Sequence, residues 1–129
     1  MRIEPFSIER WFGRYEFTAR YNIAESCVKS FTLSELAELC GADVLHGDRP
    51  IGLGYTDSRG LVELREEIAR MYPGRGPENV LVTTGAIEAN FLVFAALLGP
   101  GDIVISEFPA YQQLYEVPRS QGAEVRLWR

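Results

Sequence analysis

Residues 79–128 alternate between short apolar runs and helical patterns, and this alternation constrains the fold more than any other feature. The runs NVLVTT (79–84), DIVIS (102–106) and AEVRLW (123–128) have the length and apolar character of buried strands. A nearly all-apolar segment, AIEANFLVFAALL, separates the first two runs and predicts a buried helix, and a second helix is expected from about Pro109. The order β-α-β-α-β favours a parallel sheet with right-handed crossovers. The sequence therefore predicts an α/β fold with a mainly parallel sheet.

The first fifty residues show helical patterns instead. Four apolar side chains near the start recur at helical spacing: Ile8, Trp11, Phe12 and Tyr15. With Ser7 as N-cap, they predict a helix from Ser7 to about Phe17 that buries an aromatic face. Thr32-Leu-Ser-Glu35 has the spacing of a capping box and predicts a second, shorter helix that ends at Gly41.

A connector is expected between these two parts, because residues 41–58 contain five glycines or prolines. We therefore expect a boundary near residue 50, with residues 1–50 and 51–129 as the two units. After the connector, Ser58 is a candidate N-cap for a helix that ends at Pro73-Gly74. Its apolar stripe consists of Leu61, Leu64, Ile68 and Met71. Its charged positions, Arg65 among them, are most simply a solvated face.

Charge and composition exclude several classes of function. A net charge of −5 and a pI near 4.9 argue against a nucleic-acid partner. No apolar run reaches the roughly 18 residues of a membrane span, and the start lacks the pattern of a signal peptide, so we expect a cytoplasmic protein with no membrane partner. Cys27, Cys40 and the single His46 do not have zinc-ligand spacing, so no metal site is expected and the thiols are predicted to be reduced and partly buried.

The chemistry of a parallel α/β sheet gathers at the carboxyl ends of its strands, which directs attention to the loops at 83–87 and 106–111. In the first loop, Gly85 permits a tight turn, and Ala86 and Ile87 then present the unpaired amides of a helix start. Such a helix N-terminus suits an anion, a phosphate for example. Glu88 suits the helix dipole and could reach back to cap the helix, yet its charge would repel a nearby phosphate.

In the second loop, Tyr111 follows Pro109 and is predicted to lie in the first turn of the next helix. Its ring could stack on a flat ligand held at the neighbouring strand end. An aromatic side chain near a strand end can equally belong to the core, and both interpretations stay open at this point.

Taken together, four motifs resemble the class I/II, fold-type I aminotransferases that depend on pyridoxal phosphate. They are Gly54-Tyr-Thr-Asp-Ser-Arg-Gly60-Leu-Val-Glu-Leu64-Arg65, Val82-Thr-Thr-Gly85-Ala86-Ile-Glu-Ala89, Gly99-Pro-Gly101-Asp102 and Pro109-Ala-Tyr111. The resemblance covers roughly residues 50–129. It implies that residues 1–50 form an N-terminal helical arm and part of the small domain, and that residues 51–129 begin the large, cofactor-binding domain.

The resemblance also implies roles for individual residues. Ala86 and Ile87 would offer amides to the phosphate of pyridoxal phosphate, and Tyr111 would stack on its pyridine ring. Tyr55 matches a tyrosine that reaches the partner's cofactor phosphate across a dimer interface, which implies a homodimer; otherwise it is an ordinary connector aromatic. Gly60 and Arg65 match a G-x-x-x-L-R pattern, interpreted as helix packing and surface pairing.

In the family, the Schiff-base lysine and the residues facing the ring and the substrate carboxylate come after the third strand. This sequence ends at Arg129, where the third predicted strand closes, and Lys29 is the only lysine among its 13 Lys and Arg residues. Lys29 matches no lysine motif and is interpreted as a surface residue. We therefore expect a truncated large domain that has no catalytic residue of its own and is inactive alone.

Two functional hypotheses follow. In the first, the chain is the N-terminal portion of an aminotransferase that, when complete, moves an amino group between an amino acid and a 2-oxo acid. In the second, it is a non-catalytic α/β module that binds phosphate or a partner. Unmatched strand edges and apolar faces would lead the chain to oligomerise, to bind a complementary C-terminal portion, or to rearrange into a three-stranded unit.

Overall fold

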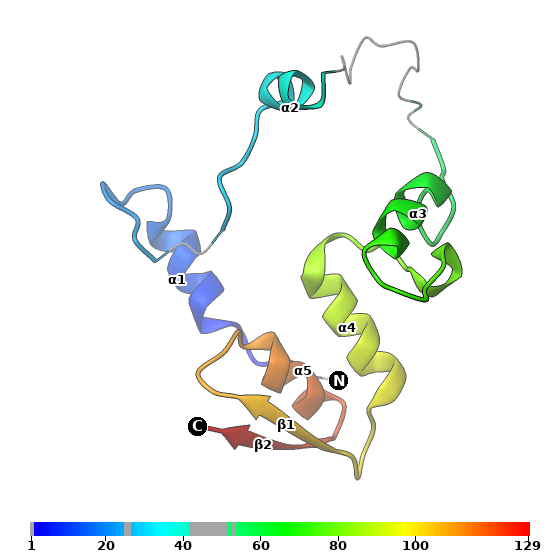
Figure 1. Ribbon diagram of the computed structural model, residues 1–129. Helices are drawn as coiled ribbons and strands as arrows, with labels where there is room; N and C mark the ends of the chain where they lie inside the picture. Colours follow the sequence, from blue (N-terminus) through cyan, green and yellow to red (C-terminus); the bar gives the residue numbers. More distant parts are fainter. Residues whose placement is uncertain (1, 25–26, 42–51, 53) are drawn as a thin grey trace.

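The computed structural model describes residues 2–24, 27–41, 52 and 54–129. The elements in chain order are α1 (Ser7–Tyr15), α2 (Leu33–Cys40), α3 (Val62–Arg70), the 3-10 helix η1 (Pro77–Asn79), α4 (Gly85–Leu97), β1 (Ile103–Glu107), α5 (Gln113–Ser120) and β2 (Glu124–Trp128). In Figure 1, α4, α5 and the two strands form one body, from which α1 and α2 extend on one side and α3 on the other. The predicted boundary near residue 50 lies outside the described residues, so the division into two units stays a prediction.

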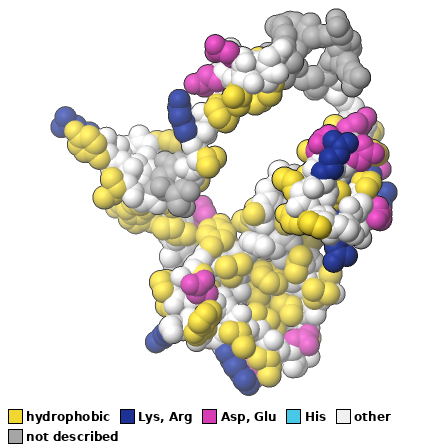
Figure 2. Space-filling view, in the orientation of Figure 1, with side chains coloured by type: hydrophobic (Ala, Val, Ile, Leu, Met, Phe, Trp, Pro, Cys, Tyr) yellow, Lys and Arg dark blue, Asp and Glu magenta, His cyan; other side chains and the backbone are white. Residues whose placement is uncertain are grey.

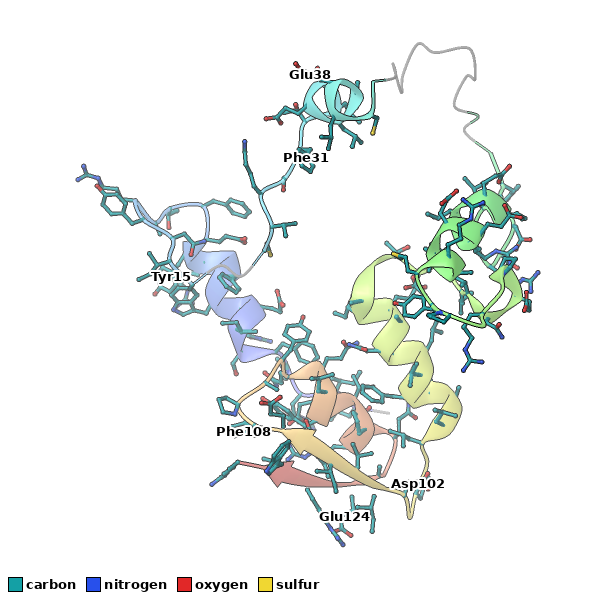
Figure 3. All side chains as sticks on the ribbon, viewed as in Figure 1. Tyr15, Phe31, Glu38, Asp102, Phe108 and Glu124 are labelled. Atoms are coloured by element: carbon teal, nitrogen blue, oxygen red, sulfur yellow. The ribbon has the colours of Figure 1, made fainter. Side chains whose placement is uncertain are left out.

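The sheet consists of β1 and β2, which are parallel and pair Ile103 with Glu124 and Glu107 with Trp128. The turn before β1 is held by the Gly99 N–H, which donates to Asp102 Oδ2 at 2.7 Å, and Asp102 lies where the chain enters β1 (Figure 3). Helix α5 connects the two strands as a crossover and contacts both of them. These elements confirm the predicted α/β class and the parallel pairing of the last two strands.

The predicted strand at 79–84 is not formed in the described part of the chain. Asn79 belongs to η1, and Val80 after it has extended backbone, but the run pairs with neither strand. The Val82 N–H donates instead to the Arg59 carbonyl at 2.9 Å. An apolar β-branched run becomes a strand only where a second strand completes its hydrogen-bond ladder. The predicted β-α-β-α-β order is thus corrected to α4-β1-α5-β2, and the three-stranded rearrangement is not observed.

The sheet is covered on one face only. Side chains alternate along both strands, and Ser106 is buried on the face towards α5. On the opposite face Ile103, Ile105 and Trp128 are exposed, together with the charged side chains of Glu107, Glu124 and Arg126. Figure 2 also shows hydrophobic side chains at the surface in the region of α4, where Val93 is exposed. This arrangement agrees with the expectation that apolar faces are left unmatched in the described chain.

Helix α1 begins at Ser7 as predicted, but its N-cap is Phe6, which makes no side-chain capping bond, and not Ser7. The predicted burial of its aromatic face is also wrong, because Trp11 is 46 % exposed and Tyr15 is 43 % exposed. The rings instead pack on one another along the helix, with Trp11 5.4 Å from both Phe12 and Tyr15 between ring centroids. Only the start of α1 is anchored to the body, which explains the exposure of the remainder.

Helix α2 has the predicted capping box. The Glu35 N–H donates to Thr32 Oγ1 at 3.1 Å, and the Thr32 N–H donates to the Glu35 carboxylate at 2.8 Å. Gly41 ends the helix in the left-handed region, at φ +64°. The capping box and this glycine therefore fix both ends of a helix that buries none of its side chains.

The capping box predicts a measurable pH dependence. Hydrogen bonds from the Thr32 amide, and then from its hydroxyl, lower the pKa of Glu35 below 4.5. The carboxylate therefore stabilises α2 above the unfolded pKa and loses this contribution as the pH falls through the lowered value. Thr32→Ala removes the hydroxyl but keeps the amide, so the Glu35 pKa should rise part of the way towards 4.5. Carboxyl NMR titration measures this, and an unchanged pKa would contradict the capping geometry.

Helix α3 departs from the prediction at its apolar stripe and at Arg65, whereas its other charged positions are exposed as predicted. Its N-cap is Leu61 rather than Ser58, and the apolar residues Leu61, Leu64 and Met71 are exposed. Arg65, predicted to be solvated, is 3 % exposed. Its guanidinium donates to the Gly60 carbonyl at 3.0 Å and to the Pro77 carbonyl at 2.8 Å. The packed face of α3 is therefore the one that carries Arg65, which donates hydrogen bonds to these two carbonyls.

Cys27 and Cys40 are free and exposed, so their predicted partial burial is wrong. His46 lies outside the described residues. Among the residues that the structure does describe, no group of His, Cys, Asp and Glu side chains is arranged to hold a metal ion. Within the same residues, no helix is long and apolar enough to cross a membrane.

Candidate functional site

The start of α4 has the geometry of an anion site. The Gly85 N–H donates to the Thr83 carbonyl at 3.0 Å, and the Thr84 N–H donates to the Glu88 carboxylate. The next two amides, of Ala86 and Ile87, are the second and third of the helix and have no acceptor in the preceding turn. Gly85 has φ +79°, and a Cβ built on it would meet no atom within 4 Å. Open space therefore lies beside a helix start that retains two amides for an acceptor.

Glu88 lies where both of its predicted properties apply. Its carboxylate turns back to the Thr84 amide, which is the reach-back to the N-cap that the sequence suggests. In this position the carboxylate accepts the hydrogen bond of the Thr84 amide, which precedes the amides of Ala86 and Ile87. It reduces the number of amides open to an anion, and its negative charge opposes a phosphate placed close by, as the sequence suggests.

Tyr111 lies two residues before α5, which begins at Gln113, so its predicted place in the first turn of that helix is wrong. The loop holds it against the N-terminal segment instead. Its hydroxyl donates to Glu9 Oε1 at 2.7 Å, and its ring meets Phe6 edge-on at 5.7 Å between centroids. The hydrogen bond to Glu9, together with desolvation and the negative charge of Glu9, raises the pKa of Tyr111 to about 12. The phenol is therefore neutral at physiological pH.

Gln113 connects the start of α4 with the Tyr111 loop. It is 1 % exposed, its Nε2 donates to the Ile87 carbonyl at 2.5 Å, and its Oε1 accepts from Asn90 Nδ2 at 3.2 Å. A cavity of about 270 Å³ beside it is lined by both Phe6 and Ile87. The structure thus brings the two predicted binding elements, α4 and the Tyr111 loop, around Phe6 and Gln113.

A second cavity, of about 390 Å³, lies beside Tyr111 beneath α1. Its apolar wall includes Ile8 and Phe12, and its polar groups include Glu9 and Glu16. Tyr111 therefore has a cavity at its side and remains 39 % exposed.

The other two residues singled out in the sequence lie apart from these elements. Tyr55 is fully exposed, and the structure does not bring it to Ala86, Ile87 or Tyr111. Lys29 has an 86 % exposed side chain, 3.5 Å from the Glu35 carboxylate. That position agrees with its interpretation as a surface lysine.

Sequence reasoning missed four residues of this region: Phe6, Glu9, Gln112 and Gln113. The first two contact a tyrosine more than a hundred positions away, and no periodicity or motif signals such a contact. The polar pair at 112–113 directly after Tyr111 was the one available signal, because a buried glutamine requires partners for its amide.

A sequence model of the family described as aminotransferase class I and II matches residues 24–129. The chain belongs to this family. As an aminotransferase-family chain, it resembles a solved PLP-dependent aminotransferase from Streptococcus suis 89-1591 with a TM-score of 0.87 and 40 % identity. That match covers 99 % of this chain and 35 % of the solved one. Capreomycidine synthase from Streptomyces vinaceus is 38 % identical over 125 residues, which are 94 % of this chain and 31 % of the relative.

These matches confirm the predicted resemblance and fold class. They also support pyridoxal phosphate as the family's cofactor. A third relative, the alpha-aminoadipate aminotransferase LysN from Thermus thermophilus, was solved with N-(5'-phosphopyridoxyl)-L-leucine. It matches 58 % of this chain and 19 % of its own length, with a TM-score of 0.52 and 35 % identity. The chain spans about a third or less of each of these relatives.

Proposed function

We propose that this chain supplies the phosphate-binding part of a pyridoxal-phosphate-dependent aminotransferase. In its complete form the protein would transfer an amino group between an amino acid and a 2-oxo acid. The observation that carries the proposal is the start of α4, where the amides of Ala86 and Ile87 remain for an acceptor beside the open space at Gly85. When bound, pyridoxal phosphate supplies the carbonyl group and electron-withdrawing ring that amino-group transfer requires.

The residues of the chain divide the binding of this cofactor between them. Ala86 and Ile87 donate backbone hydrogen bonds to the phosphate, and the helix dipole favours its negative charge. Tyr111 stacks on the pyridine ring, and its neutral phenol adds no negative charge beside the phosphate. No residue of the chain is assigned a covalent step, because Lys29 lies at the surface beside Glu35.

The proposal extends to the assembly. The open sheet face exposes Ile103, Ile105 and Trp128 among charged side chains, and a partner would bury these three. Tyr55 is fully exposed and free to contact such a partner. We propose a homo-oligomer, with Tyr55 directed at the partner's cofactor phosphate, or a complex with a complementary C-terminal portion of the family fold. The proposed location is the cytoplasm, with no nucleic acid or membrane partner.

Ala86→Pro tests the phosphate site directly. Proline is compatible with the first turn of a helix but has no N–H, so the variant removes one donor and retains α4. A lost hydrogen bond to a charged group is worth about 1.5–3 kcal/mol, so the affinity for pyridoxal phosphate should fall roughly 10- to 150-fold. Fluorescence titration of the 129-residue chain with pyridoxal phosphate measures it.

Ala86→Gly is the matched control, because glycine keeps the amide and should bind nearly as the parent chain does. Equal affinities for the proline and glycine variants would contradict the site. Equal affinity of the parent chain for pyridoxal phosphate and for inorganic phosphate would instead favour the non-catalytic phosphate-binding module.

A further inference from the structure

We propose that Glu9 is a positioning residue, which holds the ring of Tyr111 in the orientation needed to stack on the cofactor and thereby makes α1 part of the site. The inference rests on the proposed function, since it concerns the same cofactor. It adds a residue from the far end of the sequence that no motif identifies.

The first support is a hydrogen-bonded clamp between the N-terminal segment and the Tyr111 loop. Gln112 uses both ends of its amide: Oε1 accepts from the Ser7 N–H at 2.8 Å, and Nε2 donates to the Pro5 carbonyl at 3.2 Å. The Ser7 amide is the first of α1 and has no acceptor within its own helix. Gln112 therefore caps α1 and fixes its start against the residue that follows Tyr111.

The second support is the pair of contacts that the start of α1 makes with Tyr111. Phe6 is the N-cap that precedes α1 and Glu9 is the third residue of the helix, so both lie at its start. Both of them contact Tyr111, Phe6 at the ring and Glu9 at the hydroxyl. Two contacts at different points of one ring restrict its rotation, which a single contact would not do. Because Tyr111 stays 39 % exposed, part of the ring remains accessible to a ligand.

The third support is the character of the Glu9 contact. A hydroxyl that donates to a carboxylate forms a charge-assisted hydrogen bond, which is shorter and stronger than a neutral one. Other polar groups face the same cavity, namely Glu16 and Cys27, but the hydroxyl donates to Glu9. The raised pKa of Tyr111, with the Glu9 hydrogen bond as its largest cause, agrees with this contact.

The test uses the full chain with two Glu9 variants. Glu9→Ala removes the acceptor, and Glu9→Gln retains an acceptor without the charge. We expect Glu9→Ala to weaken pyridoxal phosphate binding about 3- to 10-fold, the equivalent of a lost aromatic contact, while inorganic phosphate binding at α4 stays unchanged. Glu9→Gln should bind pyridoxal phosphate nearly as the parent does. In both variants the Tyr111 pKa should fall from about 12 towards 10, further in Glu9→Ala, as measured by ultraviolet titration against a Tyr111→Phe reference.

Gln112→Ala distinguishes positioning of the Tyr111 ring from simple attachment of α1. It removes the hydrogen bonds of Gln112 to Ser7 and Pro5, but it leaves Glu9 able to accept from the Tyr111 hydroxyl. Its effect on pyridoxal phosphate binding should be smaller than that of Glu9→Ala. The inference is overturned if Glu9→Ala leaves pyridoxal phosphate affinity unchanged, or lowers it equally with phosphate affinity. Failure of the parent chain to bind pyridoxal phosphate would overturn the proposed function and this role together, whereas normal binding that is insensitive to Glu9 overturns this role alone.

Discussion

Replacing Arg65 with methionine should lower the free energy of unfolding by about 3 kcal/mol, one of the two largest effects that we expect in this chain. The substitution keeps much of the apolar volume of the side chain. It removes the guanidinium hydrogen bonds to the Gly60 and Pro77 carbonyls, at 3.0 and 2.8 Å, in a region where Arg65 is only 3 % exposed. The Pro77 carbonyl then keeps only the Val80 N–H as a donor, at 3.3 Å. A lost hydrogen bond to a charged group costs about 1.5–3 kcal/mol, and the substitution removes two of them. Denaturant unfolding followed by circular dichroism measures the change.

Arg59→Met is the matched control. Arg65 and Arg59 both form ion pairs with Asp57, at 3.4 and 3.8 Å, but the Arg59 side chain is 53 % exposed. Exposed ion pairs contribute little, so this variant should unfold within about 0.5 kcal/mol of the parent. Suppose that Arg65→Met lowered the free energy of unfolding no more than Arg59→Met does. The two carbonyls would then have to accept hydrogen bonds from water in place of the guanidinium. That result would contradict the buried role of Arg65.

Gly60→Ala should destabilise the chain by about 2–4 kcal/mol, through two independent costs. Gly60 has φ +99°, a conformation that L side chains rarely adopt. A Cβ at this position would also lie 2.6 Å from both Cβ and Cγ2 of Val82, so the backbone itself must move. Thermal or denaturant unfolding of the variant gives the combined cost.

Gly74→Ala isolates the first of these costs. Gly74 has φ +72°, but a Cβ there meets no atom within 4 Å, so only backbone strain of about 1–2 kcal/mol applies. The difference between the two variants is therefore the cost of the contact with Val82. Equal losses in the two variants would show that Gly60 and Val82 do not approach as closely as described.

Gly60 and Arg65 matter for the site because they connect α3 with the segment that leads into α4. The Val82 N–H donates to the Arg59 carbonyl, next to Gly60, and Thr84 follows as the N-cap of α4. The G-x-x-x-L-R pattern predicts helix packing with surface pairing. The packing is present. The pairing is not at the surface, because the buried guanidinium of Arg65 donates to two backbone carbonyls.

Local patterns were sufficient to predict the elements that depend on neighbouring residues. The capping box at Thr32, the turn at Gly99–Asp102 and the strands beginning at Ile103 and Glu124 all have the predicted form. Each is decided by a few consecutive residues, by glycine or aspartate at a turn or by apolar β-branched side chains. The helix start at Gly85 could be predicted on the same grounds.

The rest could not be predicted because it depends on distant parts of the chain. The run at 79–84 has strand composition, but whether it forms a ladder is decided by what lies beside it. The contacts of Glu9 and Gln112 across the chain carry no periodic signal. The binding roles of Ala86, Ile87, Tyr111 and Tyr55 remain predictions, for which the geometry at α4 and around Tyr111 supplies the support.

The central claim is that the start of α4 and the Tyr111 ring form one cofactor site, and amide NMR during titration with pyridoxal phosphate tests it most directly. We predict that the amide signals of Ala86 and Ile87 move together with the ring signals of Tyr111, with a single saturation curve. A groove of about 450 Å³ between α3 and η1 carries Arg75 and is a competing site for an anion. Shifts confined to that groove, with those of Ala86, Ile87 and Tyr111 unchanged, would contradict the account.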